Sequence, residues 1–513
     1  MIEGLMGGFA SVLEPLNLFL LFVGTAMGIL VGALPGLSSP MAIIVLLPLT
    51  FSMETLPALL TMMGVYVGTK LGGCYPAILL RTPGTPAGAC TALDGYPMAQ
   101  RGQAGLALGY ATMGSTCGGI FGWILAVTCV PILASLAVKS SNADIALVGV
   151  LGLVMVSAFV RGSTLRGLIG VTLGLLIATV GLDPIQATER FTFGSYNLMS
   201  GVPFAAALVG FFGIAVVLSD IKMIGRRSHL ITTKVTLELP TWKDLAKRWQ
   251  CIAIGGLYGT GIGAIPGVGA EISPWIAWAT VRNKSKNPEK FGTGVPEGVL
   301  TPEATNNANT GGTMVPMLTL GIPGDGSTAI MLGAMVLHGL EPGVTLMKNS
   351  GDVVYGILAG LLVATMFMFL ISWRAIRYFI LLLQQDRSWL FPFVLVLATL
   401  GAFLTMNTLF PVFIAIIFGV VGYIFESRNF PVVTVVLGII LGPIVEENIR
   451  LALALSNNDW ATFVATWPRQ VMVAAIIGLL AYEVYKGLTS KPTVRKQGVQ
   501  PQPITSQGKE DQK

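Results

Sequence analysis

The chain has 513 residues, of which 53% are hydrophobic and only 11% charged, and its formal net charge is +6. Soluble proteins carry roughly 25% charged residues, so the composition excludes an ordinary soluble domain. Residues 15–53, 103–138 and 391–425 contain no charge at all. Each of these stretches exceeds the roughly 20 residues that an α-helix needs to cross a bilayer. We therefore expect an all-α polytopic membrane protein in a lipid bilayer.

Residues 1–219 hold the first group of predicted membrane segments. The N-terminus has neither a basic flank nor a cleavage site of small residues, so we expect the first apolar run to be retained as a span. The apolar runs of this half are Leu16–Leu34, Ser39–Phe51, Pro57–Leu80, Gln103–Val138, Ile145–Val160, Leu165–Val180 and Gly201–Leu218.

Residues 220–250 form a basic linker with seven bases against three acids. Because basic loops beside membrane spans face the cytoplasm, we expect this linker to be cytoplasmic. We expect the same of the tail, residues 486–513, which is rich in Pro, Gln and Lys and is predicted to be disordered. Most of the positive charge lies in these two segments, so it does not indicate nucleic-acid binding.

Residues 251–485 hold the second group of predicted segments. Both groups together predict about ten to twelve membrane segments, mostly helical by length. Several are too short to span alone, so we expect broken or re-entrant helices among them. The apolar runs of this half are Cys251–Ile265, Ala270–Val281, Asn306–Leu337, Val354–Ile371, Leu390–Leu404, Thr408–Phe425, Pro431–Val445 and Thr462–Tyr482.

Two Pro-Gly breaks interrupt the most apolar stretches, and each occurs once in each half. The break at Gly32–Leu37 recurs 231 residues later at Gly263–Val268, and the break at Leu80–Thr85 recurs 240 residues later at Gly321–Asp325. Breaks free backbone amides and carbonyls that hydrocarbon cannot satisfy, so they persist only inside protein or beside a cavity. Paired breaks in two halves indicate the binding site of a transporter.

The loops that follow the first breaks predict opposite orientations of the two halves. Residues 282–290 carry four bases and one acid, whereas residues 50–55 carry only Glu54. Equivalent loops of opposite charge indicate opposite sides of the membrane, hence inverted repeats. If the linker and residues 282–290 are both cytoplasmic, residues 251–281 are too short for two spans and predict a re-entrant hairpin.

The first pair of breaks predicts a cation site. We expect the backbone at Gly36, Gly267 and Gly269 to bind a cation such as sodium, and Ser38 and Ser39 to contact an anionic substrate near the half-helix N-terminus. The alternative is a plain kink, because Gly and Pro are common in membrane helices.

The second pair predicts a site for a polyanionic substrate beside a hard cation, which prefers oxygen ligands. Asp325 has an alternative role as the N-cap of the next helix, and the two roles are compatible. The residues expected to contact substrate are Thr82, Pro83, Gly84, Thr85, Pro323, Gly324, Asp325 and Ser327.

Residues 297–310 are the most polar stretch that enters an apolar run. Asn side chains donate to carboxylates and accept from cations or water, so we place Asn306 and Asn307 at the substrate site. The alternative is an extramembrane loop in which Asn caps the following helix. Motifs of serine hydrolases, Walker ATPases and zinc proteases are absent, so we expect no enzymatic activity and no cofactor, with an ion gradient as the energy source.

Over roughly residues 10–485 the chain resembles the large membrane subunit of the tripartite tricarboxylate transporters, the TctA family. Asp94-Gly95-Tyr96-Pro97 is the sharpest single string. The strings that carry the resemblance are Gly32–Leu37, Leu46–Phe51, Ala77–Leu80, Pro83-Gly84, Asp94–Ala99, Ser285-Lys286, Pro288-Glu289, Phe291-Gly292, Glu297–Val299, Pro302-Glu303, Asn306–Ala308 and Leu320–Gly324.

The resemblance implies a partner set and a mechanism. It implies a small membrane subunit of about four helices, a periplasmic solute-binding protein, and sodium-driven uptake of a carboxylate across the bacterial inner membrane. It also implies a fold like that of the ion-transporter superfamily, with re-entrant hairpins moving in an elevator manner. A carboxylate channel and a non-transporting assembly subunit are the competing interpretations.

Two residues depart from the pattern that the resemblance leads us to expect. Arg81 stands in place of Asn before the Thr-Pro-Gly tip, and Cys74 stands in place of Ser after Gly72-Gly73. An arginine here is able to hold a carboxylate with two parallel hydrogen bonds. The alternative is that Arg81 reaches the lipid headgroups or pairs with Asp94.

Overall fold

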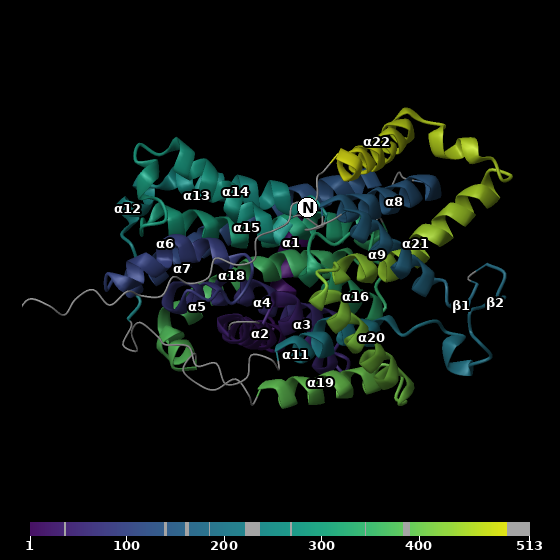
Figure 1. Cartoon of the computed structure of the whole chain (residues 1–513), viewed down its shortest axis with the longest axis horizontal. Coiled ribbons are helices and arrows are strands. Elements are labelled where there is room, and N and C mark those ends of the chain that lie inside the picture. Colours follow the sequence, from purple (N-terminus) through teal and green to yellow (C-terminus); the bar gives the residue numbers. More distant parts are fainter. Residues whose placement is uncertain are drawn as a thin grey trace, which may run out of the picture.

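The computed structural model is almost entirely helical. It describes residues 1–34, 37–137, 141–159, 164–183, 185–220, 236–266, 269–343, 345–382 and 390–489. In this part, five helices are long and apolar enough to cross a membrane, namely α2, α7, α18, α20 and α21, and the other apolar helices are shorter. The expectation of an all-α polytopic membrane protein is confirmed, and Figure 1 shows the helices in their positions.

The first half contains the elements up to α11. Its helices are α1 (Ile2–Val12), α2 (Pro15–Ala33), α3 (Ser39–Thr50), α4 (Thr55–Gly72), α5 (Cys74–Leu80), α6 (Gly88–Gln100), α7 (Ala104–Ala137), α8 (Asn142–Phe159), α9 (Thr164–Ala178), α10 (Phe204–Leu208) and α11 (Ala215–Asp220). A π-helical turn, Val209–Ile214, joins α10 to α11. The strands β1 (Gly181–Leu182) and β2 (Glu189–Arg190) form a short antiparallel hairpin.

The second half contains the elements from α12 onward. Its helices are α12 (Trp242–Lys247), α13 (Trp249–Gly263), α14 (Gly269–Lys284), α15 (Glu297–Leu320), α16 (Gly326–Leu337), α17 (Leu346–Asn349), α18 (Gly351–Leu382), α19 (Leu390–Leu404), α20 (Phe410–Ser427), α21 (Val432–Leu455) and α22 (Trp467–Thr489). The expected tail begins inside α22, and residues 490–513 and residues 221–235 of the basic linker lie outside the described residues.

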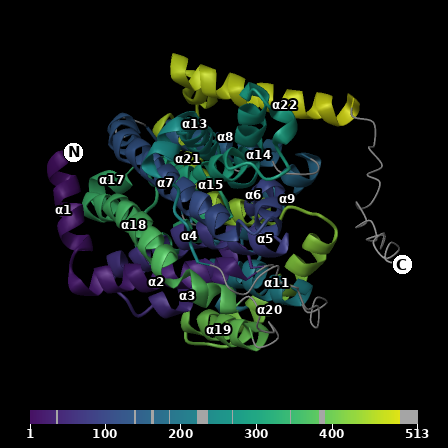
Figure 2. The same ribbon diagram turned by 90° about the vertical axis from the view of Figure 1, so that its left-hand side faces the viewer.

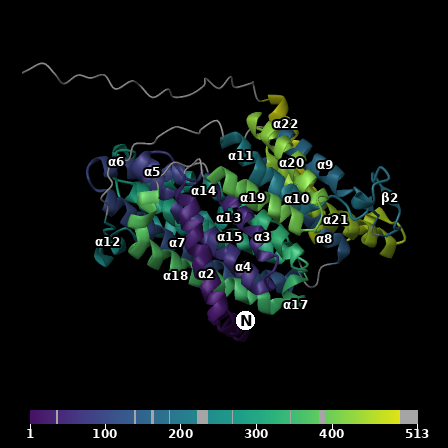
Figure 3. The same cartoon turned by 90° about the horizontal axis from the view of Figure 1, so that it is seen from below.

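Two helices at the centre of the molecule are buried on all sides. Every residue of α4 from Pro57 to Gly72 and every residue of α15 from Gly298 to Thr319 is buried. In the view of Figure 1, α13, α14 and α15 lie above α2, α3 and α4. Figure 2 shows α22 across the top of the molecule and α19 at the bottom. In Figure 3, α18 lies beside α2 and α4, against which it packs, and the β-hairpin projects at the far end.

Glycines spaced by four residues allow α2 and α4 to pack at very short range. A Cβ atom on Gly28 would lie 2.4 Å from the carbonyl oxygen of Val65, and a Cβ on Gly72 would lie 2.3 Å from that of Ile29. Small residues at such interfaces are typical of membrane helices, because close backbone approach maximises van der Waals contact. The glycines of this interface are Gly24, Gly28 and Gly32 on α2 and Gly64, Gly68 and Gly72 on α4.

The same contacts recur between α13 and α15. A Cβ on Gly259 would lie 2.4 Å from the carbonyl oxygen of Thr305, and a Cβ on Gly312 would lie 2.6 Å from that of Thr260. Adding 231 to the residue numbers of α2 and 240 to those of α4 converts the two contacts of the first half into these two contacts of the second half. The internal repeat that the Pro-Gly breaks indicate is therefore also a repeat of helix packing.

A loop outside the bundle is held by a charged cluster. Asp183, beside the β-hairpin, accepts hydrogen bonds from the backbone amides of Gln186 and Ile185 and pairs with Arg450 of α21. These hydrogen bonds hold the pKa of Asp183 well below its usual range. The cluster fastens the hairpin to the end of α21.

Candidate functional site

The first pair of breaks is described only in part. Pro35, Gly36, Gly267 and Val268 lie outside the described residues, and Gly269 is the first residue of α14. The expected sodium ligands at Gly36, Gly267 and Gly269 therefore stay a prediction.

The hydroxyls that follow the first break lie at the start of a helix. Ser38 is the N-cap of α3, where its Oγ accepts from the amide of Met41 at 3.4 Å. Ser39 is buried in the first turn of the same helix. The side chain of Ser38 thus satisfies one of the amides that every helix N-terminus leaves without an intrahelical partner.

The second breaks, Arg81–Pro86 and Gly321–Gly326, have the same backbone geometry in both halves and are called tip A and tip B below. Arg81 ends α5 at φ 57°, and Gly321 ends α15 at φ 68°. The amide of Thr82 donates to the carbonyl of Pro76 at 3.2 Å, and that of Ile322 donates to Pro316, also at 3.2 Å. Both helices thus end with a left-handed residue and with the same hydrogen bond, from the amide of residue i+6 to the carbonyl of residue i.

Each half brings its two breaks together. A Cβ atom on Gly84 of tip A would lie 2.1 Å from the carbonyl oxygen of Gly32, and one on Gly324 of tip B would lie 2.8 Å from that of Gly263. Gly32 and Gly263 stand three residues before Pro35 and Pro266. The two breaks thus lie together in both halves, and glycine is required because the backbones touch.

Asp325 in tip B has the N-cap role that was the alternative expected for it, whereas its contact with a ligand stays a prediction. Its Oδ1 accepts from the amide of Thr328 at 2.8 Å, and the Thr328 hydroxyl accepts from the amide of Asp325, which completes a capping box at α16. Its Oδ2 accepts from the Tyr66 hydroxyl at 2.8 Å and lies 3.4 Å from the Lys70 Nζ. The capping residue Asp325 therefore also contacts two buried polar side chains of α4, Tyr66 and Lys70.

Three asparagines of α15 are buried beside these side chains. Asn306, Asn307 and Asn309 are at most 1% exposed. The Nδ2 of Asn306 donates to the carbonyl of Lys70 at 3.1 Å, and the Nδ2 of Asn309 donates weakly to that of Gly259 at 3.5 Å. Residues 297–310 are helical, so the alternative of an extramembrane loop with a capping Asn is wrong.

Four amide atoms of these asparagines have no partner within the described part of the chain. They are Asn306 Oδ1, Asn307 Oδ1, Asn307 Nδ2 and Asn309 Oδ1. Buried polar groups nearly always find a hydrogen-bond partner, because burying them without one costs about 1–3 kcal/mol. Three acceptor oxygens and one donor suit a small polar ligand or a cation.

Arg81 lies on the first half of the chain, at the exposed end of tip A. Its guanidinium carbon lies 5.7 Å from the centre of the Tyr96 ring. Asp94 accepts instead from the Trp278 indole at 3.0 Å and from three backbone amides, Gly292, Gly294 and Val295. The alternative that Arg81 pairs with Asp94 is therefore wrong, and the Arg81 guanidinium is exposed.

Five further buried polar residues of α4 and α15 were not assigned to the site from the sequence: Tyr66, Lys70, Glu303, Asn309 and Thr313. Glu303 is fully buried, with its carboxylate accepting from the hydroxyls of Thr91 at 2.5 Å and Ser115 at 3.0 Å. Lys70 could have been assigned to the site from the sequence, because it is the only charged residue between Glu54 and Arg81. Ionisable residues inside apolar segments are usually functional.

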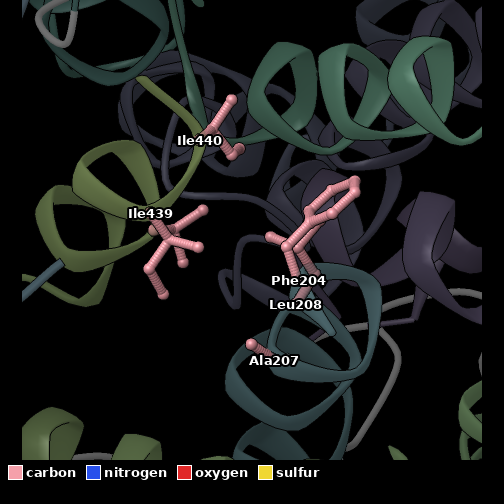
Figure 4. Close-up of a pocket in the computed structure, with 6 residues that line it drawn as sticks. Phe204, Ala207, Leu208, Ile439 and Ile440 are labelled. Carbon is pink, nitrogen blue, oxygen red and sulfur yellow. The ribbon is translucent and has the colours of Figure 1, made fainter. Parts of the chain in front are cut away.

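A small apolar pocket lies between α10 and α21. It is lined by Phe204, Ala207 and Leu208 of α10 and by Val436, Ile439 and Ile440 of α21. Figure 4 shows these side chains facing one another across it. The pocket offers no polar side chain for an anion, so the candidate site remains the tips with the polar groups of α4 and α15.

Comparisons with known proteins place the chain in a family. An uncharacterized 52.8 kDa protein in the TAR-I ttuC' 3' region of Agrobacterium vitis is 32% identical over 491 residues, which cover 96% of this chain and 98% of the relative. An uncharacterized protein in the TAR-II ttuC' 3' region of the same organism is 31% identical over 221 residues, which cover 43% of this chain and 90% of the relative. No solved structure matches the chain. Residues 18–437 match the tripartite tricarboxylate transporter TctA family, and the chain therefore belongs to this family.

Proposed function

We propose that this chain is the large permease subunit of a binding-protein-dependent secondary transporter that takes up a tricarboxylate or a related carboxylate. The observation that carries the proposal is the repeated pair of tips, each in contact with the first break of its own half. Breaks of this kind inside a membrane protein survive where they line a substrate or ion site. The family is described as a transporter family, which agrees with this role.

The two halves are proposed to be inverted repeats that move substrate in an elevator manner. The recurrence of the α2–α4 contacts between α13 and α15 supports a common ancestor of the two units. The opposite charge of residues 50–55 and 282–290 supports their opposite orientation. In such folds the site lies where the repeats meet, and tip B contacts α4 of the other half through Tyr66 and Lys70.

The substrate is proposed to bind between the tips. Arg81 and the Thr82 hydroxyl are exposed at the end of tip A, where they would donate to a carboxylate. The Nδ2 of Asn307 is a further donor without a partner among the described residues. The proposed contacts also include Ser38, Ser39, Thr85 and Ser327, which lie within or beside the breaks.

The description of the family as tripartite supports the presence of partner subunits. We propose a periplasmic solute-binding protein that delivers the carboxylate and a small membrane subunit of about four helices. The complex would lie in a bacterial inner membrane, with sodium as the coupling ion. Moving one charge through 100 mV supplies about 2.3 kcal/mol, enough for nearly two decades of accumulation.

The test starts with the ligand of the binding protein. That protein is purified, its bound carboxylate is identified, and uptake of this compound is measured in proteoliposomes that contain all three subunits. We expect accumulation against a gradient with sodium outside, and loss of accumulation when choline replaces sodium. Flux without accumulation would indicate a channel, and no flux would indicate an assembly subunit. Accumulation without any ion gradient or voltage would contradict the proposal.

A further inference from the structure

Lys70 places a positive charge in the centre of the bundle. Its side chain is 4% exposed, on a turn of α4 whose residues are all buried. The ammonium nitrogen lies 3.4 Å from Asp325 Oδ2 and 5.0 Å from the centre of the Tyr66 ring. Among the described residues, Asp325 is the acid with which Lys70 pairs. An ammonium here loses its hydration, so its energy depends on these neighbours.

The carboxylate of Asp325 is fixed in place. One of its oxygens is held by the capping box of α16, and the other accepts from the Tyr66 hydroxyl, which also contacts the Thr313 hydroxyl at 3.0 Å. A substrate carboxylate bound at Lys70 would therefore lie against the immobile carboxylate of Asp325 and be repelled. The position beside Asp325 favours a cation.

The internal repeat identifies the residues that correspond to Asp325 and Lys70. The 240-residue offset that relates tip A to tip B relates Lys70 to Thr310 and Thr85 to Asp325. Thr85 lies within tip A, where a Cβ on Gly73 would approach its Oγ1 to 2.5 Å. The counterparts of Asp325 and Lys70 are thus two neutral hydroxyl residues, Thr85 of tip A and Thr310 of α15, whereas tip B has a carboxylate that pairs with an ammonium of α4.

From this asymmetry we infer that the Lys70 ammonium is a built-in cation. It occupies the position beside Asp325 that a free monovalent cation would otherwise take. Sodium is a monovalent cation that binds carboxylate and hydroxyl oxygens, and Asp325, Tyr66 and Thr313 provide these groups. Lys70 therefore lowers by one the number of sodium ions that the protein binds. The predicted change in sodium-coupled transport rests on the proposed function, whereas the predicted change in sodium binding does not.

The test replaces Lys70 and asks whether sodium binds in its place. Wild type, Lys70→Ala and the double variant Lys70→Ala/Asp325→Asn are purified in detergent, and their melting temperatures are compared in sodium chloride and choline chloride at equal ionic strength. We expect sodium to raise the melting temperature of Lys70→Ala by about 2 °C more than that of wild type, because a ligand that binds only the folded state stabilises it. The double variant should respond like wild type, because it lacks the carboxylate.

A failure to fold is also informative in this design. A Lys70→Ala protein that can be purified only with sodium present, beside a double variant that does not need sodium, supports the inference. An equal sodium response of all three proteins overturns it, as does a Lys70→Ala protein that fails with and without sodium while the double variant folds.

Transport separates this inference from the proposed function. In proteoliposomes the Hill coefficient for sodium should rise by about one in Lys70→Ala. If wild-type uptake does not depend on sodium at all, the proposed coupling fails, and the melting experiment still decides whether Lys70 replaces a cation. An unchanged Hill coefficient together with sodium-dependent wild-type uptake overturns the role of Lys70 in coupling.

Discussion

Arg81 and Gly321 hold the same backbone conformation, 240 residues apart, with φ/ψ of 57°/19° and 68°/20°. Glycine adopts this left-handed conformation freely, whereas a residue with a Cβ atom pays roughly 1 kcal/mol or more. The first tip thus carries a large cationic side chain where the second has glycine. Such strain at an exposed position is typical of functional sites.

Arg81→Gly is predicted to separate stability from function. The substitution relieves the backbone strain, so the melting temperature should stay equal or rise by up to about 2 °C. The apparent affinity for the transported carboxylate should fall about tenfold, because a hydrogen bond between charged groups is worth roughly 1.5–3 kcal/mol. Arg81→Asn is the control, since Asn tolerates the left-handed conformation but lacks the charge. Wild-type affinity in both variants would place Arg81 outside the substrate site.

Gly84→Ala is predicted to abolish uptake. The new methyl group would lie 2.1 Å from the carbonyl oxygen of Gly32, so the two breaks of the first half must move apart. Gly261→Ala is the matched control, because a Cβ there meets no atom within 4 Å although it lies next to the second-half break. Uptake rates of both variants, corrected for the amount of protein in the membrane, check this. Equal activity of the two would mean that the contact is not needed.

Asn307→Ala and Asn306→Ala are predicted to differ in their effects. Neither amide atom of Asn307 has a partner among the described residues, so its removal should change the melting temperature by less than about 2 °C while weakening substrate binding. Asn306→Ala removes a donor to the carbonyl of Lys70 and should also lower stability. Melting curves with and without the carboxylate test both effects. An Asn307→Ala protein that binds substrate normally would exclude that side chain from the site.

Glu303→Gln is predicted to be tolerated better than Glu303→Ala. The Thr91 and Ser115 hydroxyls both donate to this carboxylate, and Gln keeps one acceptor oxygen for them. Alanine leaves both hydroxyls buried without an acceptor and opens a cavity, at a cost of roughly 2–4 kcal/mol. Thermal unfolding of the purified variants gives the comparison. Equal destabilisation by Gln and Ala would mean that the negative charge itself is required.

The tips were predictable from the sequence because their cause is local. Proline removes an amide and blocks the preceding turn, and glycine permits both a left-handed residue and close backbone contact. Repetition at offsets of 231 and 240 residues favours functional breaks over kinks, and the same offsets relate the contacts of Gly84 and Gly324. The all-α membrane fold followed from charge-free stretches longer than a span.

The partners of the tips were not predictable in the same way. Tyr66 and Lys70 reach Asp325 across more than 250 residues of chain, and nothing local in α4 points to that carboxylate. The same applies to Asp94, whose partners in residues 292–295 belong to the other half. A polar stretch such as residues 297–310 is read from composition as a loop or a helix entrance, and only its packing among α4, α7 and α13 makes it a buried helix.

The most direct test of a single carboxylate site between the two tips is an experimental structure of the three-subunit complex with sodium and the identified carboxylate. We expect density for the carboxylate within hydrogen-bond distance of both tips, residues 81–86 and 321–326, and of Asn307. Density at one tip alone, or in the apolar pocket between α10 and α21, would contradict it.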